Sequence, residues 1–276
     1  MPRDLAERGA RTKNLGMHAR DVRPGRIVPT AANASVVAAL FVHECDRDAP
    51  RVSIPRPEVH LVARFGPSAR RGLDVHAFGG RERVHRKVIR GGQWAVTARL
   101  QLGVSDAVLG VPASVMAARI VALEDLWGDA ATRRLCDRLA GAADPLGAAR
   151  MLESAIAECL RAAPKPGARA ELALAAAARL TSANVRTVAD ELGVSERHLR
   201  RVFRATVGVS PKSFSKLTRF ERALRAAREN ARASWAGIAA LAGYYDQAHL
   251  IADFRAIAGV TPRALLDELR AGPPLV

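Results

Sequence analysis

Two patterns of apolar and polar positions divide the chain near residue 104. Before that point, short apolar runs stand between Gly and Pro breaks, and the run at 93–102 alternates strictly, so that its apolar residues share one face. Alternation with a period of two predicts half-buried strands. We therefore predict a small antiparallel sheet or barrel, with strands within residues 35–45, 58–66, 73–80 and 93–102.

After residue 104 the apolar positions recur at spacings of three and four, which is the period of an amphipathic helix. This pattern predicts a helix over 111–128 that leads into one over 129–141, and another over 145–163. The segment 164–168, "PKPGA", holds two prolines and a glycine and is typical of a linker. We predict a β-plus-helix domain at residues 1–163, a linker at 164–168 and a second domain at 169–276.

The second domain is predicted to be all-α with about seven helices, so that the whole chain has an α+β fold. Ser195 is a suitable N-cap for a helix that starts beside it, and Ser210-Pro211 is a typical start for a long helix over 211–230. The other helices are expected at 169–181, 182–193, 234–243 and 246–259, and after Thr261-Pro262.

One motif occurs twice in this domain. His-Leu, three residues, Phe-Arg-Ala, two residues and Gly-Val-Ser/Thr-Pro are found at 198–211 and again, 51 positions later, at 249–262. The residues before the motif match at a shift of 50, so one residue is inserted within Tyr244-Tyr245. Each copy predicts a helix, a tight turn with glycine and a second helix, which is the helix-turn-helix motif whose second helix enters the major groove of DNA.

The first copy carries four arginines on one predicted helix face. Arg197, Arg200, Arg201 and Arg204 are spaced at i, i+3, i+4 and i+7, next to an apolar stripe. Arginine binds guanine edges and phosphates, and a serine-capped helix start can also hold a phosphate. A solvated charged face is the alternative, but the position of these arginines in a duplicated motif after "ELGVS" favours DNA contact.

The helix over 211–230 is predicted to connect the two motifs. About 20 residues at 1.5 Å each span about 30 Å, and successive major-groove faces lie about 34 Å apart. Both second helices could therefore enter adjacent turns of the groove. We expect the apolar positions of the connecting helix to pack against both motifs; they are Leu217, Phe220, Leu224 and Ala227.

The sequences "VADELGVSERHLRRVFRATVGVSPKSF" and "IAALAGYYDQAHLIADFRAIAGVTPRAL" resemble the two helix-turn-helix motifs of the AraC/XylS transcriptional regulators, over about residues 169–270. The resemblance implies a sequence-specific, DNA-binding transcription regulator, either activator or repressor, that is usually controlled by an effector domain. It places Arg197, Arg200 and Arg201 at base-facing sites of the first recognition helix. The second helix departs from the family, because Ile251-Ala252 replace a frequent Ser/Thr-Arg pair.

The arginine face, the helix caps and the positions carried over from the family together give the predicted DNA-binding residues. They are Ser195, Arg197, Arg200, Arg201, Arg204, Lys212, Asp246, Gln247, Ala248, Ile251 and Ala252. The first recognition helix is expected at about 195–206 and the second at about 246–256. We expect the first to supply most of the polar base reading, and the second to read weakly, by shape or by apolar contact.

The N-terminal segments "EVHLVARFG" and "GVPASVMAARIVALEDLWG" resemble the small β-plus-helix effector domain of one branch of such regulators. Residues 1–163 are accordingly expected to serve sensing or dimerisation, and the resemblance gives no ligand. Double-stranded DNA is the expected partner. A small-molecule effector in the N-terminal domain, a homodimer, and contact with RNA polymerase if the protein is an activator stay open.

The composition agrees with DNA binding, but it does not show which part of the chain binds DNA. The formal net charge of +16 favours a polyanionic partner, but the charge is not confined to one end of the chain. The three cysteines lack zinc spacing, and the N-terminus lacks the apolar core of a secretory signal. No window approaches the length of a membrane span. We expect a cytoplasmic protein that does not act at a membrane.

No catalytic motif is present, so we expect neither an enzyme nor a bound cofactor or metal. His43, Glu44 and Cys45 with the histidines of nearby strands are interpreted as polar residues of a sheet, and Cys136 and Cys159 as inert thiols. Two alternatives stay open. One is an enzyme or ligand-binding protein with an appended DNA-binding domain, and the other is a non-specific architectural DNA binder.

Overall fold

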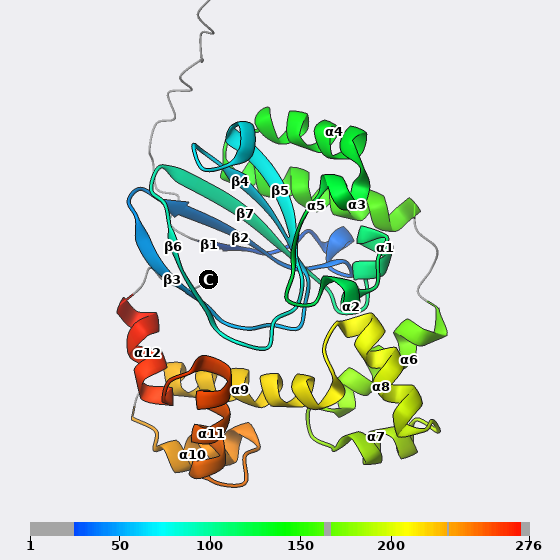
Figure 1. The fold of residues 1–276 in the computed structure, drawn as a ribbon, viewed down its shortest axis with the longest axis vertical. Helices are drawn as coiled ribbons and strands as arrows, with labels where there is room; N and C mark the ends of the chain where they lie inside the picture. Colours follow the sequence, from blue (N-terminus) through cyan, green and yellow to red (C-terminus); the bar gives the residue numbers. More distant parts are fainter. Residues whose placement is uncertain (1–24, 163–166, 231, 272–276) are drawn as a thin grey trace, which may run out of the picture.

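The molecule has a β-rich N-terminal region and a helical C-terminal region, as predicted (Figure 1). The computed structural model describes residues 25–162, 167–230 and 232–271. Most of the predicted linker, residues 164–166, lies outside the described residues, and Gly167 directly precedes the first C-terminal helix. The division into separate domains at this point stays a prediction.

The N-terminal region contains an antiparallel sheet with the strand order β1-β2-β7-β4-β5-β8, and a separate hairpin formed by β3 and β6. The strands are β1 (Gly25–Ile27), β2 (Val37–Cys45), β3 (Ala49–Ser53), β4 (His60–Phe65), β5 (Leu73–Phe78), β6 (His85–Ile89), β7 (Gln93–Leu100) and β8 (Ile120–Ala122). The predicted alternation is confirmed in β7, where Val96, Ala98 and Leu100 are buried and Trp94 is half-buried. Leu102 lies beyond the strand and packs against a C-terminal core instead.

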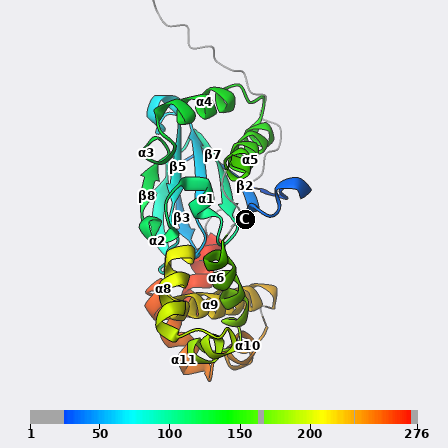
Figure 2. The same cartoon turned by 90° about the vertical axis from the view of Figure 1, so that its right-hand side faces the viewer.

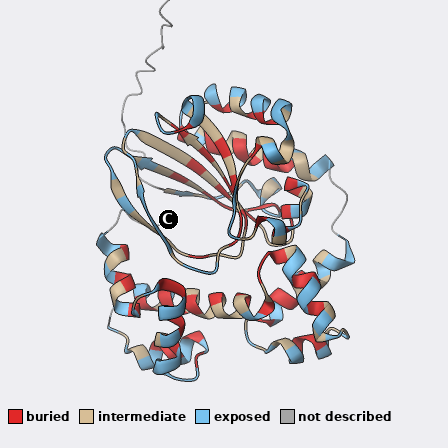
Figure 3. Ribbon diagram, viewed as in Figure 1, coloured by how far each residue is buried: buried red, intermediate tan, exposed pale blue. Residues whose placement is uncertain are grey.

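Two helices cover one face of this sheet (Figure 2). They are α4 (Asp129–Ala140) and α5 (Pro145–Ala162), and both agree with the predicted ranges. Buried residues run along the strands and along the facing side of α5 (Figure 3). Leu152 and Ile156 of α5 share a core with Leu61 and Leu100 of the sheet, so the apolar stripe of the helix and the apolar face of the sheet shield each other from water.

The prediction of one helix over 111–128 is wrong. This segment forms two one-turn helices, α2 (Ala113–Met116) and α3 (Glu124–Trp127), on either side of β8, and follows another short helix, α1 (Ser105–Leu109). Ala118 has a φ of 56°, which breaks the helix, and β8 pairs with β5. Apolar residues at helical spacing, such as Met116 and Leu123, enter the sheet core from separate elements.

The C-terminal region holds seven helices in the described residues. They are α6 (Ala168–Arg179), α7 (Val185–Glu191), α8 (Glu196–Val207), α9 (Pro211–Glu229), α10 (Trp235–Ala242), α11 (Gln247–Ala258) and α12 (Pro262–Ala271). Helix α9 runs from one helical group to the other (Figure 1). We call α6–α8 with the start of α9 the first module, and α10–α12 with the rest of α9 the second module.

Each module has its own apolar core. Phe203 of α8 and Phe214 at the start of α9 meet in the first core, with ring centroids 5.4 Å apart. Phe254 of α11 and Phe220 of α9 meet in the second, at 4.5 Å. The prediction that one set of residues packs α9 against both modules is wrong. Leu217, Phe220, Leu224 and Ala227 all belong to the second core, and the first is reached from the preceding turn of α9.

The N-terminal region contacts both modules. The Val84 amide donates to the Ile257 carbonyl at 2.9 Å, and Arg86 on β6 binds Glu268 on α12 at 2.8 Å. At the first module, a Cβ placed on Gly208 would lie only 3.0 Å from the carbonyl oxygen of Ala113. The backbones of α2 and of the end of α8 therefore touch directly, whereas the second module is held by hydrogen bonds and an ion pair.

No helix in the described ranges has both the length and the apolar composition needed to cross a membrane. Over the same residues, no three His, Cys, Asp or Glu side chains gather in an arrangement that could hold a metal ion.

Candidate nucleic-acid interface

The turn between α7 and α8 is built from local signals in the sequence. The Asn184 side chain accepts from the Thr187 amide at the start of α7, and Gly193 takes a φ of +66° in the turn. The Ser195 side chain accepts from the His198 amide at 3.2 Å, which caps α8 as predicted. These groups end α7 and start α8, so that the two helices are joined by a short turn.

Helix α8 has an apolar face and a cationic face. Leu199, Val202, Phe203 and Val207 are buried. The four predicted arginines are all exposed on the other side of the helix. Arg200 pairs with Glu196, and Arg201 lies 3.3 Å from a ring nitrogen of His198. Within the residues that the structure describes, Arg197 and Arg204 form no ion pair. Their charge is therefore available to a polyanion.

Lys212 is exposed in the first turn of α9. The Ser210 side chain accepts from the Ser213 amide at 3.0 Å and caps this helix. Ser195 is also exposed. The structure thus brings two capped helix starts and the arginine face to one module, as the sequence predicts.

Helix α11 of the second module is capped by Asp246, whose carboxylate accepts from the His249 amide at 2.7 Å. Gly243 ends the preceding helix with a φ of +83°. The outer face of α11 presents Gln247, Ala248 and Ala252, which are exposed. Ile251 is half-buried and packs against the second core, so it offers DNA less surface than the sequence indicates.

Three exposed residues of the second module were not among the predicted DNA-binding residues. Tyr245 is 94% exposed and Leu241 is 76% exposed, beside the start of α11. Arg255 is exposed on α11 and aligns with Arg204 of the first copy. Arg255 could have been predicted from the repeat, because it aligns with Arg204. Tyr245 could have been predicted from the extra residue in the second turn. The outer face of α11 thus keeps one of the four arginine positions of α8.

Tyr244, the residue before Tyr245, is buried in the second module. Its ring meets the His249 ring at 5.1 Å, and the Arg219 guanidinium lies 5.4 Å from its centroid. Burial, together with the nearby Asp253 carboxylate, raises the pKa of Tyr244 well above its usual range. The phenol therefore stays neutral and serves the packing of α11.

In the described residues, the histidines of the N-terminal sheet belong to no group that could hold a metal ion. His43 lies on the face of the sheet opposite α5. Its Nδ1 is 2.9 Å from the Nη2 of Arg51. Burial, then Arg51 and Lys87, lower the pKa of His43 to about 4. Burial, then Arg99 and Arg56, lower the pKa of His60 to about 3. Both rings are neutral at pH 7, on a face whose charge comes from arginine and lysine.

The thiols of Cys136 and Cys159 are half-buried. Burial is the main cause that raises the pKa of each thiol above its ordinary value. A raised pKa lowers the fraction of reactive thiolate, which agrees with the interpretation of both residues as inert.

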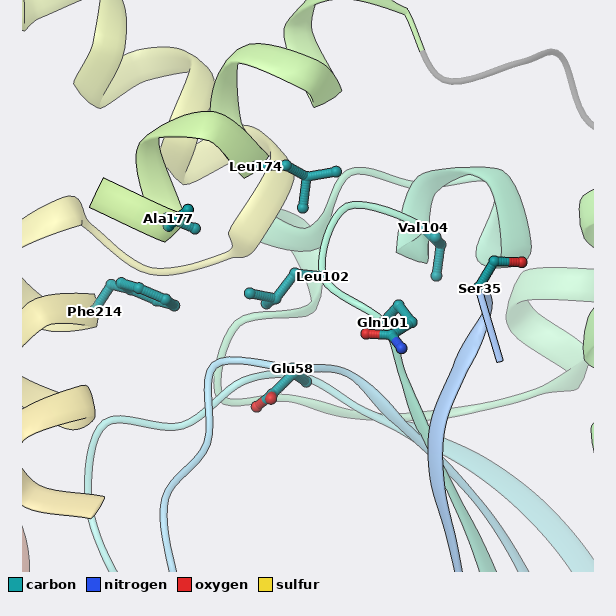
Figure 4. A pocket seen from close by; sticks show the side chains of 9 residues that line it. Ser35, Glu58, Gln101, Leu102, Val104, Leu174, Ala177 and Phe214 are labelled. Carbon is teal, nitrogen blue, oxygen red and sulfur yellow. The ribbon is translucent and has the colours of Figure 1, made fainter. Parts of the chain in front are cut away.

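A pocket of about 560 Å³ lies where the N-terminal region meets the first module (Figure 4). Its lining combines residues of both regions: Ser35, Glu58, Gln101, Leu102, Val104, Leu174, Ala177, Ala178 and Phe214. Six of these side chains are apolar. Among the described residues, one carboxylate oxygen of Glu58 is buried without a hydrogen-bond partner. The sequence could not indicate this pocket, because its walls come from segments that are far apart in the chain.

A family model described as a helix-turn-helix domain matches residues 188–268. Among solved structures, the chain is similar to the DNA-binding domain of AdpA, a global transcriptional factor, in complex with a target DNA. The identity is 28%, the match covers 37% of this chain and 93% of that chain, and the TM-score is 0.32.

The chain is also similar to unsaturated fatty acid bound ToxT from Vibrio cholerae strain SCE256, at 10% identity over 82% of this chain and 94% of that chain, with a TM-score of 0.44. ToxT from Vibrio cholerae in its P21 form is similar at 9% identity, over 83% of this chain and 96% of that chain, with a TM-score of 0.41. At these TM-scores the structural likeness assigns no function. No curated protein sequence matches the chain.

Proposed function

We propose that the chain is a sequence-specific DNA-binding transcription regulator whose two recognition helices, α8 and α11, contribute unequally to DNA reading. Both helices lie within residues 188–268, which a helix-turn-helix family model matches. Helix α8 supplies most of the polar base contacts. Helix α11 reads weakly, through apolar contact and shape. The observation that carries this proposal is the exposed arginine face of α8, which α11 lacks except at Arg255.

The length of α9 supports simultaneous binding. Its 19 residues at 1.5 Å per residue span about 28 Å, which is close to the separation of about 34 Å between successive major-groove faces. One chain can therefore place both helices on the same side of a DNA duplex. Arg197, Arg200 and Arg201 are assigned to base edges, and Ser195, Arg204 and Lys212 to the phosphates beside them.

Selection of bound sites from a random DNA pool, followed by binding of the full chain to the selected operator and to random duplex, tests this proposal. We expect an operator with a strongly specified half-site for α8 and a weakly specified one for α11. Specific binding should exceed non-specific binding by about 10³ or more at physiological salt. Equal affinity for operator and random duplex would instead identify a non-specific architectural protein.

We further propose that the N-terminal region controls DNA reading through the pocket it shares with the first module. The mainly apolar lining suits a small molecule with an apolar body. Ala178 is an exposed residue of the pocket wall on α6, so Ala178→Trp should fill the pocket and leave the cores intact. A thermal-shift screen of small organic compounds should give compounds that stabilise the wild type and have no effect on Ala178→Trp. Equal shifts in both proteins would exclude this pocket as the effector site.

The remaining expectations about partners stay predictions. They are a homodimer, contact with RNA polymerase if the protein is an activator, cytoplasmic location and the lack of an enzymatic activity. An enzyme with an appended DNA-binding domain is the competing hypothesis, and a turnover assay with compounds that bind the pocket distinguishes the two.

A further inference from the structure

The second recognition helix carries a buried carboxylate where the first carries a hydrocarbon side chain. Asp253 on α11 aligns with Val202 on α8. Both residues face the interior of their module, with 8% and 3% of their surface exposed. A charged group in such a position is costly unless it is paired. The shared scaffold does not require Asp253, because Val202 fills the same position in the first module.

Cations from the connecting helix surround this carboxylate. The Lys216 Nζ lies 3.1 Å from Asp253 Oδ1, and the Arg219 Nη2 lies 3.5 Å from Oδ2. His249, one turn earlier on α11, places its Nε2 at 4.0 Å from Oδ2. Because both cations belong to α9, the ion pairs join the second recognition helix directly to the helix that connects the modules.

Tyr244 of the second turn belongs to the same cluster. Arg219 lies over the Tyr244 ring, and this ring packs against His249. Tyr244 stands where the first copy has Val194, because the amides of both residues donate to equivalent carbonyls in the preceding helix. The Tyr244 ring and the buried carboxylate therefore occur together, on the side of α11 that faces α9.

Stability alone does not require this cluster. A buried ion pair is often no more stabilising than well-packed apolar residues of similar volume. In the part of the chain that the structure describes, Asp253 Oδ2, Arg219 Nε and the Tyr244 hydroxyl are buried without a hydrogen-bond partner, which reduces the gain further. Ion pairs do differ from apolar contacts in being directional, since they favour one relative placement of the two helices.

We propose that Asp253 is a positioning residue for DNA reading by the second module. Its ion pairs with Lys216 and Arg219 fix α11 on α9, and so fix where Gln247, Ala248 and Ala252 meet the DNA relative to α8. The first module needs no such device, because its arginines are long enough to adjust to the base edges. This inference rests on the proposed reading of DNA by the second module.

The test uses Asp253→Asn in the full chain, which keeps the shape of the side chain and removes its charge. Two DNA duplexes are compared, the selected operator and the same operator with the α11 half-site scrambled. The wild type should prefer the intact operator. In the variant, the ratio of the affinities for the intact and the scrambled operator should fall about tenfold, or to one if the wild-type ratio is smaller than that. A change of this size corresponds to the loss of one base-reading contact. Binding to the scrambled duplex should stay unchanged.

Asp267→Asn is the matched control, because it removes the same charge from an exposed pair with Arg270 on α12. It should leave the preference for the intact operator unchanged. Lys216→Met should act like Asp253→Asn, and the double variant should lose little more than either single variant, since both changes break one interaction.

Two results would overturn the inference. One is a variant that unfolds more easily but keeps the wild-type preference between the duplexes, and the other is an equal loss of affinity for both duplexes. Either would make Asp253 a support of the fold only. If the wild type itself binds both duplexes equally, the proposed reading by the second module is wrong and the inference falls with it.

Discussion

The two modules of the C-terminal region have the same scaffold and different surfaces. Phe203 and Phe254 occupy the same position in their cores, and Gly208 and Gly259 both end their recognition helices with a positive φ. Four exposed positions of α8 carry arginine. At the aligned positions α11 keeps one arginine, Arg255, and has Ala248, Ile251 and Ala252 at the others. The duplicated motif thus preserves the residues that make the helix-turn-helix, and leaves the residues that would meet DNA free to differ.

The modules also differ in how their recognition helices are held. Apolar contacts hold α8 through Val202 and Phe203, whereas α11 adds the ion pairs of Asp253 to the contacts of Phe254. The first module has the arginine-rich recognition helix and an apolar core. The second module has the less charged recognition helix and a core that also contains ion pairs. Under the proposed division of DNA reading, precise placement matters more to α11 than to α8, because long arginine side chains can adjust to the base edges.

The largest expected effect concerns the shared scaffold. Phe203→Ala and Phe254→Ala should each destabilise their own module by about 3–5 kcal/mol, because each leaves a cavity in a closed core. Urea unfolding, with a probe in each module, measures the two losses. A much smaller loss for one phenylalanine would show that the two cores are not equivalent.

The next effect separates the two surfaces. Arg201→Ala should weaken operator binding by about 1–3 kcal/mol through loss of a guanine contact. Fluorescence anisotropy with the operator and with random duplex measures it. An equal loss on both DNAs would reassign Arg201 to a phosphate.

A smaller and equal effect is expected at the helix caps. Ser195→Ala and Asp246→Ala each remove the acceptor of one amide at a helix start, and each should cost about 1 kcal/mol of stability. Thermal unfolding of both variants beside the wild type gives the comparison. A cost at Ser195 alone would mean that α11 is held by its ion pairs and not by its cap.

The smallest effect is expected from Ala252→Ser. A single hydroxyl on an exposed face should change operator affinity by less than about 0.5 kcal/mol. The same anisotropy assay detects the change. A loss as large as that of Arg201→Ala would contradict the unequal contribution of the two helices.

Local signals explain why the helical region could be predicted from the sequence within a few residues. Ser195, Ser210 and Ser234 cap the helices that follow them, and the glycines in the turns mark the ends. The arginine face of α8 follows from spacing alone. By contrast, β6 is a short strand, "HRKVI", whose charged residues gave no strand signal, and helix-like spacing at 111–128 arises from three short elements.

Contacts between distant segments explain the rest. Asp253 looks like one acidic residue in a helix, and its cations lie more than 30 residues away on α9. The half-burial of Ile251 likewise depends on how α11 packs against the second core. Spacing in the sequence gives the face of a helix on which a residue lies, but it does not give the neighbour that covers that face.

The contact between Gly208 and Ala113 has a mechanical consequence. The counterpart of Gly208 in the second module, Gly259, has no atom within 4 Å of the Cβ it lacks. At Gly208 the N-terminal region lies directly against the backbone at the end of α8. The side-chain atom nearest to this contact is the Ala113 methyl carbon, which has no rotamer to change. We therefore expect a displacement of α2 to shift the end of α8 with it.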